Sequence, residues 1–151
     1  MPTHYQGTPA ETAALDAYIK LMRASDSLTS SLMPVFEKYG LTFSQFGALE
    51  ALYHLGPMCL GELARKILRS GGNLTLVARN LERQKLVRRI PSPEDRRVHR
   101  LELTSKGKSL IQKAFAEHVR NLTNRMSVLS QDEQRTLGAL AKKLGIQMPA
   151  S

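Results

Sequence analysis

The stretch from Leu60 to Gly107 constrains the fold of this chain more than any other part. Its apolar residues recur at helical spacing, are interrupted by Arg69-Ser70-Gly71-Gly72, and then recur at helical spacing again. Two short runs follow, Leu86–Ile90 and Val98–Leu103, in which apolar and polar residues alternate as in strands. The segment PSPEDRR joins these runs as a charged loop. This order predicts a helix, a turn, a second helix and a β-hairpin.

The positive charge of the chain is concentrated in the same stretch. Between Arg65 and Lys108 there are thirteen Lys and Arg against four Asp and Glu, and this excess of nine equals the net charge of the whole chain, +9. A basic segment of this kind predicts a phosphate backbone as partner. Aromatic residues make up only 5% of the chain, which disfavours stacking on single-stranded nucleic acid. We therefore expect double-stranded DNA.

The two central helices are expected at Leu60–Leu68 and about Ser70–Gln84. Their inward-facing residues are predicted to be Leu63, Ala64 and Ile67 in the first and Leu74, Val77 and Leu81 in the second. The second helix of a helix-turn-helix enters the major groove, where Asn contacts adenine, Arg contacts guanine and an apolar side chain meets a thymine methyl. Its N-terminal backbone favours phosphate. The predicted contacts are Arg69, Ser70, Gly71, Gly72, Asn73, Thr75, Leu76, Arg79 and Asn80. An ordinary solvated helix is the alternative.

The hairpin supports the DNA-binding interpretation, because an arginine at the tip of a β-ribbon enters the minor groove. Asp95 is the exception in a basic loop, and we interpret it as the partner of Arg97 that fixes the shape of the tip. The predicted contacts from this wing are Asp95, Arg96, Arg97, His99 and Arg100. Alone, the hairpin would be explained as a charged, solvated loop; joined to a helix-turn-helix, it predicts a wing.

Helices with long apolar stripes flank the basic stretch. Thr8 and Glu11 form a capping box that predicts a helix over residues 10–38, with a kink or a break near Met33 caused by Pro34. Such a helix is too long for a small core alone and is expected to pack on the C-terminal helices or on a second subunit. Further helices are predicted from Thr42 to His54, from Thr104 to Leu129, and from Ser130 to Leu144. Thr42 with Gln45 and Ser130 with Glu133 form two more capping boxes.

Several other functional classes are excluded by the sequence. It has no glycine-rich phosphate loop, no nucleophile elbow and no paired carboxylates in an apolar setting, so we expect neither catalysis nor a cofactor. The histidines are not spaced as metal ligands are, and Cys59 is the only cysteine of the sequence, so we expect no metal site. We interpret Cys59 as a structural residue rather than an oxidant sensor. Without a signal peptide or an apolar span, the protein is expected to be cytoplasmic.

Three runs resemble the MarR family of bacterial winged-helix regulators: GLTFSQFGALEAL, GELARKILRSGGNLTLVARNLERQKLVRR and PSPEDRRVHRLELTSKG. The most specific part is Asp95-Arg96-Arg97 followed by Leu103-Thr104-x-x-Gly107. Lys85 departs from the family pattern, which often has Gly before Leu-Val. The resemblance covers nearly the whole chain and implies one mainly α (α+β) domain over residues 1–151. A winged helix-turn-helix at about 42–107 would lie between dimerisation helices at about 8–38 and 108–147.

The resemblance also implies a function. It predicts a bacterial or archaeal, nucleoid-associated homodimer that regulates transcription from a near-palindromic operator, with half-sites about 10 bp apart. In the family an Asp-x-Arg pair orders the wing tip, here Asp95 and Arg97, and an arginine of the tip reaches DNA. A small aromatic or phenolic ligand, or an oxidant, would release a repressor from DNA. The segment GPMCLGELARKILRSGGNLT resembles the branch of the family whose members respond to quinone-like or phenolic compounds.

The candidate residues for an effector pocket are Met22, Met33, Phe36, Phe46 and Tyr53, for which ordinary core packing is the alternative. The competing function, from another class, is a basic, non-catalytic scaffold that binds RNA or protein. Such a scaffold would share the charge but would need neither symmetry nor an effector.

Overall fold

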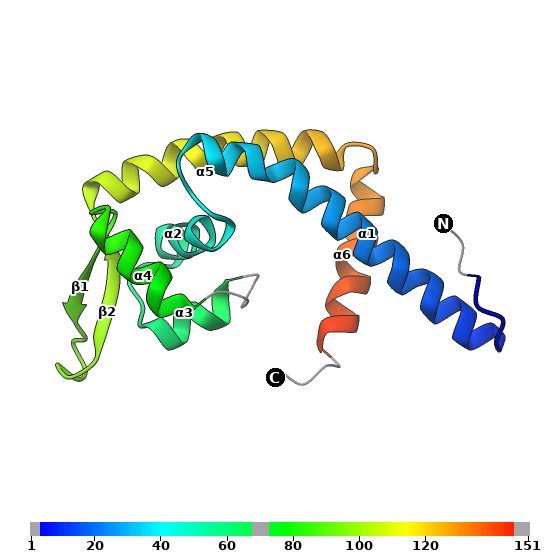
Figure 1. Cartoon of the computed structure of the whole chain (residues 1–151), viewed down its shortest axis with the longest axis horizontal. Coiled ribbons are helices and arrows are strands. Elements are labelled where there is room, and N and C mark those ends of the chain that lie inside the picture. Colours follow the sequence, from blue (N-terminus) through cyan, green and yellow to red (C-terminus); the bar gives the residue numbers. More distant parts are fainter. Residues whose placement is uncertain (1–3, 68–72, 147–151) are drawn as a thin grey trace. The chain divides into compact units, whose positions relative to one another are not determined.

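The structure is a computed structural model that describes residues 4–67 and 73–146. Within these ranges it contains six helices and two strands (Figure 1). In chain order they are α1 (Pro9–Lys38), α2 (Phe43–Leu55), α3 (Leu60–Lys66), α4 (Leu74–Arg83), β1 (Val87–Pro91), β2 (His99–Leu103), α5 (Ser105–Met126) and α6 (Gln131–Ile146). The predicted order of two short helices and a hairpin between flanking helices is therefore confirmed, while the turn predicted at Arg69–Gly72 lies outside the described residues.

All three predicted capping boxes are present. In each, the N-cap hydroxyl accepts the backbone N–H of a residue three positions on, and that residue's side chain accepts the N-cap N–H. The pairs are Thr8 with Glu11, Thr42 with Gln45 and Ser130 with Glu133. These local contacts fix where α1, α2 and α6 begin.

α1 is continuous through Pro34, so the break predicted near Met33 does not occur. Pro34 lacks an N–H and cannot donate to the carbonyl of Ser30, which weakens a helix interior. Its two neighbours on the inner face, Leu32 and Phe36, are however 8% and 1% exposed. Burial of two such side chains stabilises the helical geometry by several kcal/mol, about 1.5–3 each, which is enough to offset the lost hydrogen bond.

The hydrophobic core of the segment up to His118 includes residues of each of its helices and of both strands, and α2 contributes more of them than any other element: Phe46, Ala48, Leu49, Ala51 and Leu52. The largest fully buried side chains are Phe36, Leu49, Leu63, Leu81, Leu101 and Ile111. Met58 attaches the hairpin to the helices, because its backbone exchanges two hydrogen bonds with Leu101, of 3.2 and 2.9 Å. Ala64 is exposed rather than inward-facing as predicted, and α3 ends at Lys66, before the predicted Leu68.

Residues from Val119 onward form a second compact unit. α5 ends at Met126, earlier than the predicted Leu129, and Gln134 of α6 donates hydrogen bonds to the carbonyls of both residues. The apolar stripe of α6 faces solvent: Leu137, Leu140 and Leu144 are 43%, 60% and 58% exposed. None of the helices in the described ranges has the length and apolar character required to cross a membrane.

Candidate nucleic-acid interface

The outer face of α4 is polar and accessible, as its sequence periodicity predicts. Ala78 and Leu81 are buried against the core, and Leu74 and Val77 are half-buried beside them. The opposite face presents Thr75, Leu76, Arg79 and Arg83, all exposed, with Asn80 half-buried at its edge. Leu76 is 48% exposed, so its side chain is accessible to an apolar group of a partner.

Asn73 is the N-cap of α4, so the helix begins at Leu74 and the predicted start near Ser70 is wrong. The side-chain oxygen of Asn73 accepts the N–H of Leu76 at 3.3 Å. A paired contact with adenine needs both the oxygen and the amide of Asn, so Asn73 would have to release the cap to make one. The predicted contacts Arg69, Ser70, Gly71 and Gly72 lie outside the described residues.

At the hairpin tip, Arg97 and Asp95 are bonded three times. The Arg97 backbone N–H and Nε donate to Asp95 Oδ1 at 3.0 and 3.2 Å, and Nη2 donates to Oδ2 at 3.3 Å. These bonds lower the pKa of the Asp95 carboxyl, and the side-chain bonds from Arg97 have a larger effect than its backbone bond. The predicted contact between the two residues is confirmed. Arg97 remains 90% exposed, so the pair orders the tip and still presents the guanidinium outward.

The other arginines of the hairpin divide into two groups. Arg88 bonds Glu102 across the strands, and Arg89 bonds Glu82 of α4 at 2.7 Å, which ties β1 to the helix. Arg96, with His99 beside the tip, is exposed, and Arg100 is half-buried. Arg96 and Arg100 form no ion pair with any residue in the described part of the chain. The same is true of Arg79 and Arg83 of α4. Four cations therefore remain available to a polyanion.

The C-terminal end of α4 is fixed by a backbone turn at Lys85, which has a φ of 61°. The N–H of Lys85 donates to the carbonyl of Glu82 and that of Leu86 donates to Leu81, both at 2.9 Å. This is a Schellman turn, in which the residue with positive φ is usually glycine. Lys85 stands where the family often has Gly, yet the turn keeps the backbone conformation that suits glycine. The lysine side chain is therefore attached at a strained position.

The segment Thr104–Gly107 holds this turn against α5. The Thr104 hydroxyl donates to the carbonyl of Lys85 at 2.6 Å and accepts the N–H of Gly107 at 3.0 Å. Lys106 Nζ donates to the carbonyl of Gln84 at 2.9 Å. A Cβ on Gly107 would lie 1.9 Å from the carbonyl oxygen of Leu86, so no other residue fits without displacing the backbone. The Leu-Thr-x-x-Gly motif thus joins α4 to α5.

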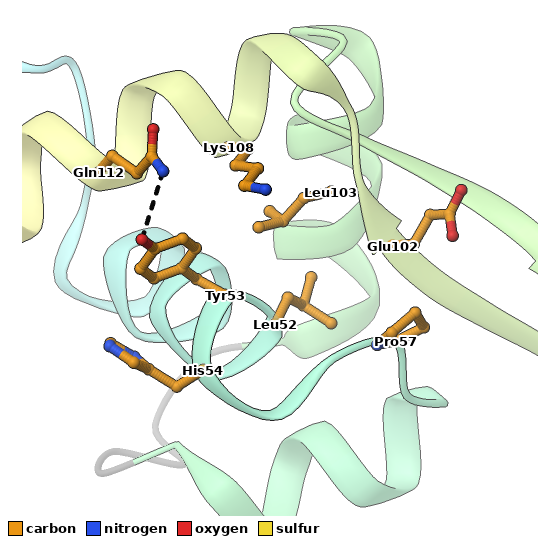
Figure 2. Close-up of a pocket in the computed structure, with 8 residues that line it drawn as sticks. All are labelled: Leu52, Tyr53, His54, Pro57, Glu102, Leu103, Lys108 and Gln112. Carbon is orange, nitrogen blue, oxygen red and sulfur yellow. Dashed lines mark hydrogen bonds between the residues drawn. The ribbon is translucent and has the colours of Figure 1, made fainter.

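The residues predicted to form an effector pocket differ in their surroundings. Phe36 and Phe46 are buried core residues whose rings stack at 4.2 Å, and Met22 is 49% exposed. Met33 is half-buried on α1. Tyr53 is different, because it lines a pocket of about 640 Å³ between the end of α2, β2 and the start of α5 (Figure 2).

The pocket is lined by Leu52, Tyr53, His54, Pro57, Glu102, Leu103, Lys108 and Gln112. Seven of these eight residues, all but Tyr53, are not predicted from the sequence. Lys108 and Gln112 carry no local signal, since they are ordinary polar residues of an amphipathic helix. Only the pairing of that helix with α2 brings Gln112 to Tyr53, 59 residues earlier in the chain.

A short helix, then an exposed polar helix, then a hairpin with an ordered arginine at its tip is the arrangement of a winged helix-turn-helix, a class of DNA-binding protein. Residues 41–99 match the family model "MarR family". The chain is 35% identical over 133 residues to the HTH-type transcriptional regulator MhqR of Bacillus subtilis, which covers 88% of this chain and 92% of that protein. The chain belongs to the MarR family and is a DNA-binding transcriptional regulator.

Solved structures agree with this fold. A putative MarR-like transcription regulator from Bacillus cereus superposes with a TM-score of 0.77 over 90% of this chain and 98% of that one, at 20% identity. NadR in complex with 4-hydroxyphenylacetate superposes with a TM-score of 0.71 over 98% of this chain and 100% of that one, at 25% identity. A relative of similar fold therefore binds a small aromatic acid.

Proposed function

We propose that this protein is a homodimeric repressor that binds a near-palindromic operator through α4 and the wing and is released by a small aromatic ligand. The observation that carries the proposal is the combination of an accessible polar face on α4 with an ordered, outward-directed Arg97 in one compact unit. We propose no catalytic role, in line with relatives that are transcriptional regulators.

In this proposal α4 lies in the major groove and the wing lies in the adjacent minor groove. Thr75, Leu76 and Arg79 contact base edges, with Asn80 at the margin of the interface. Before the helix, the contacts of Arg69, Ser70, Gly71, Gly72 and Asn73 go to phosphate or sugar. On the wing, Arg96 and Arg97 reach the minor groove, while His99 and Arg100 contact the backbone and Asp95 orders the tip.

The proposal that the flanking helices form the dimer interface is supported by their exposed apolar side chains. Tyr18, Leu21 and Met22 of α1 are 59%, 41% and 49% exposed. The stripe Leu137, Leu140 and Leu144 of α6 is exposed as well. Apolar stripes of this extent are unfavourable in water and are typical of surfaces covered by another subunit. Two symmetric heads would then require two half-sites, about 10 bp apart.

The test is a footprint on the DNA beside the protein's own gene, with the oligomeric state measured by light scattering. We expect a dimer, protection of two half-sites, and an operator affinity that falls steeply as salt is raised, because each phosphate contact releases counterions. A monomer at micromolar concentration with equal affinity for random duplex would contradict the proposal. That result, together with tighter binding to an RNA or a protein partner, would favour the basic scaffold instead.

A further inference from the structure

An ion pair joins the wing to α4 at the base of the hairpin. Arg89 of β1 donates through Nε to Oε1 of Glu82 in α4 at 2.7 Å. In the hairpin Arg89 stands directly opposite Leu101, and the side chains of directly opposed residues lie on the same face of an antiparallel pair. Because Leu101 belongs to the core, this is the face of the hairpin that is turned toward the helices. Glu82 is the group that meets the Arg89 guanidinium there.

Beyond Arg89 the hairpin leaves the core. Leu101 is buried, whereas Ser92 is the only buried residue among residues 90–100, all of which the structure describes. This outer part contains the tip, which is ordered by contacts within its own loop. The direction of the tip relative to α4 therefore depends on the contacts that hold the strands at their base. The pair of Glu82 with Arg89 is such a contact.

The charge of Glu82 is unfavourable for DNA binding by itself. Glu82 is the only acidic residue of α4, and it lies in the stretch that carries the positive excess of the chain. A carboxylate at this place repels a phosphate backbone. The side chains of Glu82 and Arg89 are 32% and 38% exposed, so their pair adds little to the stability of the fold. Neither affinity for phosphate nor stability accounts for Glu82, which leaves its geometric effect on the wing.

We propose that Glu82 is a positioning residue for operator binding: by holding Arg89 it fixes the hairpin in the direction in which α4 and the wing enter adjacent grooves together. Glu82 itself contacts no DNA. This role rests on the proposed function. Two parts of an interface bind more tightly when they are fixed relative to each other beforehand, because less freedom is lost on association. The gain applies to an operator that both parts must match, and not to a random duplex, which each part binds through phosphate alone.

The experiment measures binding of the full chain to two duplexes by fluorescence anisotropy. One is the segment protected in the footprint, and the other is a shuffled duplex of the same length and composition. Glu82→Gln keeps the shape of the side chain and removes its charge. We expect it to lower affinity for the protected duplex by about fivefold and to raise affinity for the shuffled duplex by about twofold, because one repulsive charge is lost. A variant that had merely lost its fold would bind both duplexes more weakly.

Glu94→Gln is the matched control. Glu94 is exposed in the loop of the wing and forms no ion pair within residues 4–67 and 73–146. This variant makes the same change of charge, so it should raise affinity for both duplexes by about twofold. Arg89→Gln tests the other half of the pair through the ratio of the two affinities. The ratio should fall as far as in Glu82→Gln, and the double variant should lower it no further, because both substitutions remove one contact.

If Glu82→Gln bound the protected duplex as tightly as Glu94→Gln does, the positioning role would be overturned and the proposed function would stand. A ratio left unchanged by Arg89→Gln would overturn it as well, because Arg89 would then act as a phosphate contact and weaken binding to both duplexes equally. A wild-type chain with equal affinity for the two duplexes would instead reject the proposed function, and the positioning role with it.

Discussion

At the scale of single residues, Lys85 occupies a backbone conformation that suits glycine. Its φ of 61° is required by the turn that ends α4, and the turn is held by Thr104 and by the close approach of Gly107 to Leu86. A left-handed backbone costs a residue with a Cβ roughly 1–2 kcal/mol. The surrounding contacts over-determine the geometry, so the lysine accepts the strain.

Lys85→Gly should therefore raise the free energy of unfolding by up to about 1 kcal/mol, part of the relief being offset by the greater freedom of glycine in the unfolded chain. Denaturant unfolding measures this change. Lys85→Ala is the control, because it removes the charge and keeps the strained Cβ, and it should match the wild type within about 0.5 kcal/mol. A glycine variant no more stable than the alanine variant would show that the turn carries no strain.

At the scale of elements, the wing is a short hairpin whose tip is ordered by one side-chain pair. Arg97 contacts Asp95 through its backbone and its guanidinium together, so the two substitutions act differently. Arg97→Ala removes the group proposed to enter the minor groove. Asp95→Asn leaves that group in place and weakens only the bonds that orient it.

We expect Arg97→Ala to lose about 1–3 kcal/mol of operator affinity and to reduce the slope of affinity against salt by about one phosphate contact. Asp95→Asn should lose less affinity and keep the salt slope. Fluorescence anisotropy over a salt series measures both, and circular dichroism checks that helix content is unchanged. If Arg97→Ala bound the operator as tightly as the wild type, the assignment of the wing would be refuted.

At the scale of the whole molecule, an aromatic cluster joins α1, α2 and α5. The ring of His118 lies 5.4 Å from Phe36 and 5.0 Å from Phe46, and Phe115 completes the contact on α5. Its Nδ1 is buried and makes no hydrogen bond within the described part of the chain. Burial lowers the pKa of His118 below its ordinary value of 6.5, because a charged ring would lose its hydration there.

A lowered pKa in the folded state means that His118 stabilises the fold fully above about pH 6.5, the value in the unfolded chain, and progressively less as pH falls through its folded pKa. We therefore expect Tm to fall between pH 7.5 and 5 more steeply for the wild type than for His118→Phe. Burial also raises the pKa of Glu50, so protonation of this carboxyl favours the folded state as the pH falls. This effect opposes that of His118, and it is the same in the wild type and in His118→Phe. Parallel Tm profiles would contradict this role of His118.

Local sequence determined much of this protein. The caps at Thr8, Thr42 and Ser130, the buried face of α4 and the Asp95–Arg97 pair all depend on residues a few positions apart, so their spacing alone predicts them. The concentration of charge in one stretch likewise predicted the segment that forms the winged helix-turn-helix.

Only the tertiary structure decided the features that depend on residues distant in sequence. Packing of Leu32 and Phe36 keeps α1 continuous at Pro34, and the position of α3 leaves Ala64 exposed. The pairing of Gln112 with Tyr53 forms the pocket that sequence periodicity could not indicate. Helical spacing shows which face of a helix carries apolar side chains and which carries polar ones. The residues that this face contacts are determined only when the elements pack against one another.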